Sequence, residues 1–336
     1  MIRRLVPLRI APLLAVAGAL ASVVAVLFGA DASAQAFPAK PIKLLVGFAA
    51  GGPTDVIARV IAQDMATTFT HGVVVENKTG ANALIATQEV KRAPPDGYTL
   101  LVTTLSHNVN AILMADKKPY DPVKDFAPVS LVAFLPLVMV AKPDSPFNSA
   151  QDVVKAAKAR PGEISYASAG NGGSAHLAGA LVETLSGTKM THVPFRGNAP
   201  ALTEVIAGRV TFMFYPMIGI ADQVAQKRLK ALAVSTEKHH PDYPGAATMA
   251  ESGFPGFEQY TQGLGVVAPA ATPAPVVDRL NQVIRAALAR PETREKLKAL
   301  GAITEGGSTP AEFRAWLGKD AERWEKVVKA AGVTAE

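Results

Sequence analysis

The stretch that most constrains the fold covers residues 42–60 and combines a short apolar segment, a loop of small residues and the start of an amphipathic helix. The apolar segment 42–46 has the length of a buried strand, and residues 49–52 (Ala-Ala-Gly-Gly) leave the backbone open to close approach by a ligand. Apolar residues recur at helical spacing through 56–65, and the first free amides of such a helix face the loop. The pattern predicts an anion-binding loop, although a Gly-Gly turn that serves only packing is an equally good interpretation.

The N-terminus predicts a secretory signal peptide over residues 1–36. Three arginines precede a long apolar segment at 10–30, and small residues follow it with A-x-A cleavage sites that end at Ala34 and Ala36. An uncleaved membrane anchor is the alternative, but the cleavage sites and Pro12 favour removal. We therefore expect a periplasmic protein whose mature part has about 300 residues, enough for one large domain or two lobes.

Charge and cysteine content exclude several function classes. The net charge of +6 includes three arginines and one aspartate of the leader, so the mature chain carries +4, and its basic residues are scattered. This distribution argues against nucleic-acid binding. The chain has no cysteine, which excludes disulfides, thiol nucleophiles and thiolate metal sites.

Strands alternate with helices in two series, which predicts an α/β fold with mainly parallel sheets. The second series repeats the opening unit: a strand at 164–168, a Gly-rich loop at 169–174 and a helix at 176–185. Ligands bind at the carboxyl ends of strands in such sheets, so Ser106, after the strand 98–104, is a candidate site residue. The other expected elements are strands at 73–76, 129–134, 137–141, 190–195, 210–215, 231–235 and 260–268 and helices at 83–92, 151–160, 199–207, 275–289, 291–300 and 310–330.

Enzymatic signatures are incomplete. The segment 172–176 nearly matches the G-x-S-x-G nucleophile elbow, but His176 takes the place of the last glycine, so a hydrolase that uses Ser174 and His176 is a minor alternative. A loose dinucleotide fingerprint at 170–175 lacks the acidic residue that binds ribose. The six histidines do not have the spacing of zinc ligands. We therefore expect no enzyme, no metal and no cofactor.

Two backbone-rich loops, one in each lobe, predict a clamp for a small carboxylate. About four charge-assisted hydrogen bonds of roughly 1.5 to 3 kcal/mol each suffice for micromolar affinity, which requires about 8 kcal/mol. Thr54, Asp55, Ser106 and Ser174 offer additional side-chain hydrogen bonds. Asp55 either selects an amino or hydroxyl group of the ligand or interacts with the helix dipole as a first-turn acid.

A series of motifs in order along the chain resembles the Bug-type substrate-binding proteins of tripartite tricarboxylate transporters. The motifs are FPAKPI (37–42), VGFAAGGPTD (46–55), VVEN (74–77), PDGYTL (95–100), YDPVKDFAPVS (120–130), YASAGN (166–171), SAHL (174–177), HVPFRG (192–197) and RLKALAV (228–234). The resemblance covers essentially the whole mature chain.

This resemblance implies a two-lobed type II periplasmic binding protein, with lobe 1 at 37–137 plus 265–336 and lobe 2 at 138–264. It further implies a monomer that carries a small carboxylate to a membrane permease. A protein that presents the ligand to a receptor kinase has the same sequence features and stays an alternative. The ligand-binding residues that the resemblance implies are Phe48, Ala50, Gly51, Gly52, Thr54 and Asp55 in one lobe and Ala169, Gly170, Asn171, Gly173, Ser174 and His176 in the other.

The chain departs from the usual family pattern near the expected cleft. Gly47 and the pair Ala49-Ala50 replace prolines, and Pro53 replaces a glycine and removes one amide donor. Tyr215-Pro216 stands where Asp-Asn is frequent, and Gly263-Leu264 where Trp-Phe is common. We therefore add Tyr215 to the candidate ligand-binding residues, and the sequence leaves the identity of the ligand open.

Overall fold

The computed structural model describes residues 37–117 and 119–334. The chain divides into two units, Met1–Ala39 and Lys40–Glu336, and the expected leader at 1–36 lies outside the described residues. Within the first unit the structure describes Phe37, Pro38 and Ala39, with a cis peptide bond before Pro38. All further description concerns the second unit.

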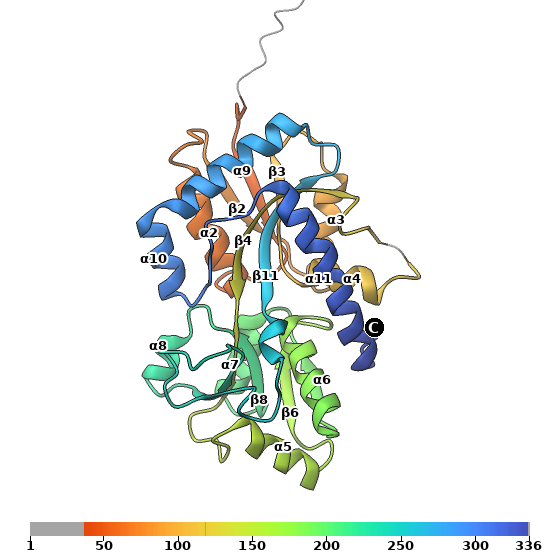
Figure 1. The fold of residues 1–336 in the computed structure, drawn as a ribbon, viewed down its shortest axis with the longest axis vertical. Helices are drawn as coiled ribbons and strands as arrows, with labels where there is room; N and C mark the ends of the chain where they lie inside the picture. The colour runs from red at the N-terminus through yellow and green to blue at the C-terminus, as the bar shows by residue number, and fades with distance from the viewer. Residues whose placement is uncertain (1–36, 118, 335–336) are drawn as a thin grey trace, which may run out of the picture. The chain divides into compact units, whose positions relative to one another are not determined.

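The first sheet has the strand order β2-β1-β3-β11-β4 (Figure 1). Its strands are β1 (Ile42–Val46), β2 (Val73–Asn77), β3 (Thr99–Thr103), β4 (Phe126–Leu135) and β11 (Gln262–Pro269). β1 pairs in parallel with β2 and β3, and β11 runs antiparallel to β3 and β4. The buried, mostly β-branched and leucine side chains of β1 and β3 place these strands in the middle of the lobe.

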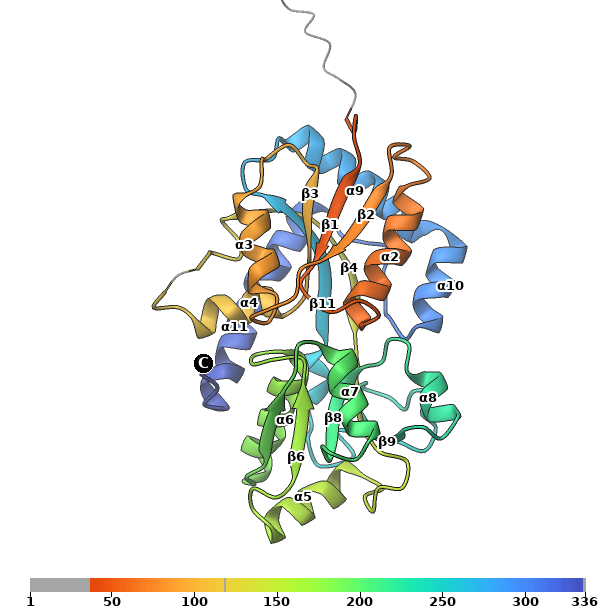
Figure 2. The same cartoon turned by 180° about the vertical axis from the view of Figure 1, so that it is seen from behind.

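Helices cover both faces of this sheet. α2 (Pro53–Met65) packs with α9 (Ala274–Ala289) and α10 (Pro291–Ala299) on one face, as Figure 2 shows from behind. α3 (Leu84–Arg92), α4 (Ser106–Leu113) and α11 (Pro310–Ala330) lie on the other. The predicted capping box of α11 is confirmed, because Thr309 and Glu312 bond reciprocally at its start. α4 begins directly after β3, where the sequence analysis expected no helix.

The second sheet has the strand order β10-β9-β5-β8-β6-β7. Its strands are β5 (Leu137–Ala141), β6 (Ser165–Ser168), β7 (Thr191–Pro194), β8 (Phe212–Pro216), β9 (Lys230–Val234) and β10 (Ala247–Thr248). β5 runs antiparallel to both neighbours, and the other pairs are parallel. α5 (Ala150–Ala159), α6 (Ser174–Ser186), α7 (Asn198–Ile206) and α8 (Ala221–Ala225) complete this lobe.

The chain passes between the sheets twice. The first passage is at Pro136, between β4 and β5, and the second follows the 3₁₀ helix η1 (Phe257–Tyr260). β11 pairs with β4 from Gln262 onward, so the expected boundary at residue 265 falls inside this strand. α11 adds a third link, since its Trp324 packs in one buried cluster with Val109 of α4 and Leu177 of α6. None of the described helices is both long and apolar enough to span a bilayer.

Candidate functional site

A cavity of about 410 Å³ lies where loops of the two sheets face each other. The lobe of the first sheet contributes Gly47 and Phe48 after β1, residues 80–83 before α3, and Leu84 at the start of α3. The second sheet contributes the loop 169–171 after β6 and residues 194–196 at the end of β7. Asn110, Leu113 and Met114 of α4 and its C-terminal end complete the lining. The strand ends meet here, as expected for ligand sites in α/β sheets.

The loop before α3 has an unusual backbone. Ala81, Asn82 and Ala83 have φ values of 45°, 49° and 71°, a left-handed conformation that is unfavourable for residues other than glycine. Gly47 packs directly on this loop, because a Cβ at Gly47 would lie 2.2 Å from the Cβ of Ala83. The departure from proline at position 47 therefore matches the close approach of the two loops.

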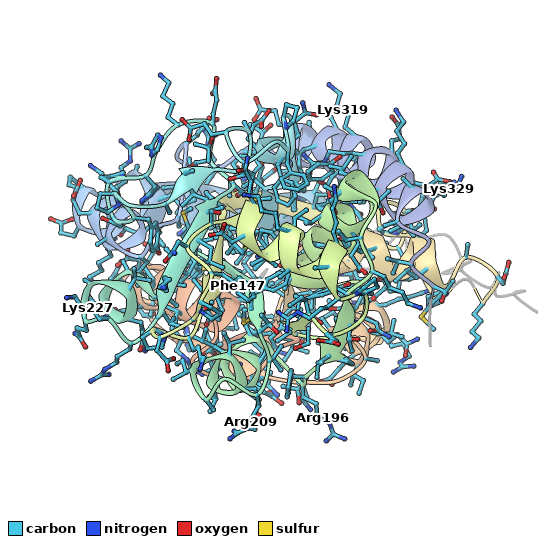
Figure 3. All side chains as sticks on the ribbon, turned by 90° about the horizontal axis from the view of Figure 1, so that it is seen from below. Phe147, Arg196, Arg209, Lys227, Lys319 and Lys329 are labelled. Carbon is cyan, nitrogen blue, oxygen red and sulfur yellow. The ribbon has the colours of Figure 1, made fainter. Side chains whose placement is uncertain are left out.

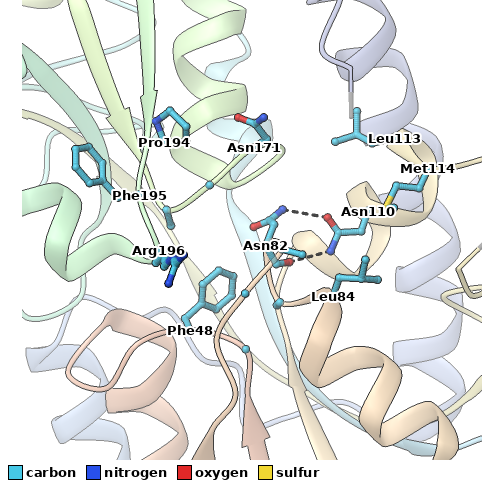
Figure 4. Close-up of a pocket in the computed structure, with 16 residues that line it drawn as sticks. Phe48, Asn82, Leu84, Asn110, Leu113, Met114, Asn171, Pro194, Phe195 and Arg196 are labelled. Carbon is cyan, nitrogen blue, oxygen red and sulfur yellow. Dashed lines mark hydrogen bonds between the residues drawn. The ribbon is translucent and has the colours of Figure 1, made fainter. Parts of the chain in front are cut away.

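A polar network holds this loop against α4. The Nδ2 of Asn82 donates to Oδ1 of Asn110 at 3.2 Å, and Nδ2 of Asn110 donates to the carbonyl of Asn82 at 2.8 Å (Figure 4). Ser106 donates its hydroxyl proton to Oδ1 of Asn82 at 2.9 Å. Ser106, a predicted ligand-binding residue, thus supports the cavity wall without being part of the lining.

Asp55, in the first turn of α2, bonds back to the first Gly-rich loop. Its carboxylate accepts hydrogen bonds from the Gly51 amide at 2.9 Å, from Arg59 Nε at 2.9 Å and from Asn77 Nδ2 at 2.9 Å. Burial alone raises the pKa of Asp55, but the hydrogen bonds from Arg59, Gly51 and Asn77 hold it below its usual value. This buried carboxylate is ionised near neutral pH and stabilises the N-terminal turn of α2.

The second Gly-rich loop rests on two stacked imidazoles. His176 and His192 lie parallel, with ring centroids 3.8 Å apart. Nδ1 of His176 accepts the Gly172 amide proton at 3.0 Å, and Nε2 of His192 lies 2.6 Å from Oγ of Ser168. Burial and the neighbouring His176 lower the pKa of His192 to about 3, so His192 is neutral at physiological pH. His176 thus orients the loop through Gly172.

Two glycines of the second lobe, Gly172 and Gly197, lie close to residues of the first lobe. A Cβ added at Gly172 would lie 2.7 Å from Leu113 and 2.9 Å from Val109 of α4. A Cβ at Gly197 would lie 3.2 Å from the Cβ of Ala49. Glycine at these positions allows the loops of both sheets to approach at the cavity.

The predicted site residues fall into two groups. Phe48, Ala169, Gly170 and Asn171 line the cavity. The others are not part of the lining; they lie in the loops and first turns at the N-termini of α2 and α6, at the end of β8 or at the start of α4: Ala50, Gly51, Gly52, Thr54, Asp55, Ser106, Gly173, Ser174, His176 and Tyr215. Tyr215 is buried in the core of the second lobe, and burial raises its pKa to about 12.

Several lining residues were missed. The loop 80–84 carries no motif that indicates a left-handed backbone, whereas the spacing of Val109 and Leu113 was a usable signal for a helix after β3. Arg196 belongs to the HVPFRG motif and is the one cationic side chain among the described lining residues. Among the described lining residues none is acidic. The described residues also contain no cluster of three or more potential metal ligands.

The chain is similar to a known protein family. A model of the "Tripartite tricarboxylate transporter family receptor" matches residues 57–333. A UPF0065 protein in the tcbD-tcbE intergenic region of Pseudomonas sp. (strain P51) is 40% identical over 295 residues, which cover 88% of this chain and 87% of the relative.

Solved structures show the same fold. Periplasmic binding protein BugD is 36% identical with a TM-score of 0.84 over 89% of this chain and 100% of BugD. R. palustris Rpa4515 with adipate is 32% identical with a TM-score of 0.83 over 89% of this chain and 99% of that chain. The predicted two-lobed α/β fold of periplasmic binding proteins is confirmed by these matches.

Proposed function

This chain belongs to the tripartite tricarboxylate transporter receptor family, and from this premise we propose that it captures a small carboxylate in the periplasm and delivers it to a membrane permease of that transporter type. The family consists of solute-binding receptors, and the predicted relation to Bug proteins is confirmed. The related Rpa4515 structure contains adipate, a carboxylate of the expected size class.

The observation that carries this proposal is the cavity between the lobes. Its described lining residues include the asparagines Asn82, Asn110 and Asn171 and the exposed Arg196, and none of these described lining residues is acidic. An anion entering the cavity therefore gains favourable interactions without repulsion from a lining carboxylate. The guanidinium of Arg196 is exposed and projects from the surface (Figure 3), where it also attracts anions from solution.

Both lobes contribute to the cavity, which supports a closing clamp. A ligand that contacts Phe48 and Asn171 at once interacts fully only when the loops are close, as they are around Gly172 and Gly197. Such a ligand stabilises the closed arrangement by its differential affinity for that arrangement.

A thermal-shift screen of mono-, di- and tricarboxylates, with the corresponding alcohols and amides as uncharged controls, tests the proposal. A ligand at 100 times its Kd adds about 2.7 kcal/mol of apparent stability, which raises Tm by about 5 °C in a protein of this size. We expect at least one acid, and none of its uncharged analogues, to raise Tm. If no acid raises Tm and native mass spectrometry detects no co-purified acid, the proposed function is wrong.

Arg196→Gln and Arg228→Gln form a matched pair for the same assay. Both arginines are exposed, but only Arg196 lines the cavity. We expect Arg196→Gln to weaken acid binding roughly fivefold to tenfold, since a partly solvated charge pair contributes about 1 kcal/mol. Equal effects of the two substitutions would assign the loss to net charge and not to the cavity.

A further inference from the structure

The peptide bond between Phe48 and Ala49 lies at the edge of the cavity, next to the second lobe. Phe48 of the first lobe and Arg196 of the second both line the cavity (Figure 4). The residues that follow them, Ala49 and Gly197, approach each other closely. A Cβ added at Gly197 would lie 3.2 Å from the Cβ of Ala49 and 3.5 Å from its backbone nitrogen. The amide of Ala49 therefore lies where the two lobes meet beside the cavity.

The orientation of this peptide bond is fixed by a side chain of the first lobe. Nδ2 of Asn77, at the end of β2, donates one hydrogen bond to the carbonyl of Phe48 and another to Oδ1 of Asp55, both at 2.9 Å. Oδ1 of Asn77 accepts a hydrogen bond from Nη2 of Arg59 at 3.1 Å. The three bonds hold the amide group of Asn77 in one orientation, and with it the carbonyl of Phe48.

The N–H group of Ala49 points away from Asn77. The peptide bond between Phe48 and Ala49 is trans, since the one cis bond among the described residues precedes Pro38. In a trans peptide bond the carbonyl and the N–H group point in opposite directions. No described residue accepts a hydrogen bond from the N–H group of Ala49. A half-buried amide without a protein acceptor is open to a ligand in the cavity.

The glycine amides of the same loop are used inside the protein. The Gly51 amide donates to Asp55 at 2.9 Å, and the Gly52 amide donates to the carbonyl of Ala49 at 3.3 Å. Residue 53 is a proline and has no amide proton. Alanine at position 49, one of the departures from the family pattern, keeps an N–H group that proline lacks. The loop therefore offers a donor ahead of its glycines, at Ala49.

From this geometry we propose that the N–H group of Ala49 donates a hydrogen bond to the ligand carboxylate, and that Asn77 is the positioning residue that aims this group. A hydrogen bond from a backbone amide to a carboxylate is charge-assisted and contributes more than a bond between neutral groups. Because Asn77 fixes the peptide before the ligand arrives, the donor loses little conformational freedom on binding. This inference rests on the proposed carboxylate binding and names residues of that site.

Ala49→Pro removes the amide proton and suits the backbone, because Ala49 has a negative φ, as proline does. Ala270→Pro is its control. Ala270 is exposed, does not line the cavity and also lacks an acceptor for its N–H group among the described residues. It lies in the turn closed by the hydrogen bond from the Thr272 amide to the carbonyl of Pro269 at 3.0 Å.

Isothermal titration calorimetry of the full mature chain with acetate, succinate, adipate, citrate and benzoate gives the Kd values. For the acid that binds most tightly, we expect Ala49→Pro to raise Kd at least tenfold, which corresponds to about 1.4 kcal/mol. We expect Ala270→Pro to leave this Kd unchanged. If Ala49→Pro binds the acid as tightly as the unsubstituted protein, this inference is wrong and the proposed function stands.

A double substitution tests the role of Asn77. Asn77→Ala releases the carbonyl of Phe48, and we expect it to raise Kd by about threefold to tenfold. In the Ala49→Pro background no N–H group is left to aim, so Asn77→Ala should lower the unfolding free energy there without raising Kd further. Additive losses of affinity would overturn the positioning role, because a merely structural effect acts in both backgrounds.

NMR spectra of the mature chain with isotope-labelled alanine test the hydrogen bond in the unsubstituted protein. The resonances missing from Ala49→Pro and Ala270→Pro identify the two amides. Saturation with the most tightly bound acid should shift the Ala49 amide proton downfield and slow its exchange with solvent, and leave the Ala270 resonance in place. An unchanged Ala49 amide in the acid-bound protein overturns this inference, whatever the Kd of Ala49→Pro, and leaves the proposed function standing. If none of these acids binds, both are overturned.

Discussion

The approach of the second Gly-rich loop to helix α4 allows a quantitative prediction for Gly172→Ala. Gly172 has a φ of 72°, and an added Cβ would lie 2.7 Å from Leu113 and 2.9 Å from Val109. The left-handed backbone costs an alanine about 1 kcal/mol, and crowding of a packed contact costs about 1 to 3 kcal/mol more. If the loop relieves the crowding by moving away from α4, the crowding lowers the affinity for the ligand and leaves the free energy of unfolding unchanged.

Gly187→Ala separates the two costs. Gly187 ends the same helix that Gly172 precedes, has a φ of 62° and has no atom within 4 Å of an added Cβ. We therefore expect both variants to lose about 1 kcal/mol of unfolding free energy, measured by urea denaturation without ligand. Only Gly172→Ala is expected to lose affinity, by about fivefold to a hundredfold for a crowding cost of 1 to 3 kcal/mol.

The result that refutes this reasoning is equal affinity in the two variants. Calorimetry with the tightest-binding acid from the thermal-shift screen gives this comparison directly. Equal affinities would mean that ligand binding does not depend on close contact between Gly172 and α4. A further loss of stability in Gly172→Ala alone, with affinity unchanged, would make the contact a packing feature of the ligand-free fold.

Two other perturbations follow from the packing and the buried imidazoles. An added Cβ at Gly265 would lie 2.2 Å from the ring of buried Phe313, so Gly265→Ala is expected to lose about 1 to 3 kcal/mol of unfolding free energy. Gly318 lies in open space on α11, so Gly318→Ala should gain up to about 1 kcal/mol. Equal urea midpoints of the two variants would contradict both expectations. Burial lowers the pKa of His107 to about 4 and that of His192 to about 3, so the unfolded chain takes up protons below pH 6.5 while the folded chain does not. The free energy of unfolding should therefore fall as the pH is lowered from 7 to 5, by about 2 kcal/mol for His107 and by less for the partly solvated His192. A free energy of unfolding that stays constant over this pH range in urea titrations would contradict neutral burial of the two rings.

The fold was predictable from the sequence because its signals are local and repeated. The strand-loop-helix unit after residue 42 and its repetition after residue 164 depend on hydrophobic periodicity and small residues, both of which are visible in the sequence. The lining of the cavity was predictable from the sequence only where it follows these loops, at Phe48 and at 169–171.

The opposite wall of the cavity depends on tertiary contacts. Ala81 and Ala83 have no intrinsic preference for a left-handed backbone, and the hydrogen bonds between Asn82 and Asn110 join segments 28 residues apart. The role of Asp55 likewise could not be predicted from the sequence alone. Its sequence position allows a ligand contact or a structural role, and the hydrogen bonds from Gly51, Arg59 and Asn77 that support the structural role are visible only in the folded protein.

Gly263, one of the departures from the family pattern, lies next to a bulky side chain of the C-terminal helix. Tryptophan is common at this position in Bug-type proteins, but a Cβ at Gly263 would lie 2.3 Å from the indole ring of Trp316 on α11. That ring also packs edge-on against Phe134, with centroids 6.0 Å apart. An aromatic side chain from the C-terminal helix thus occupies the space next to β11. Since neither Gly263 nor Trp316 lines the cavity, this contact concerns packing between strand β11 and helix α11 and not the lining of the cavity.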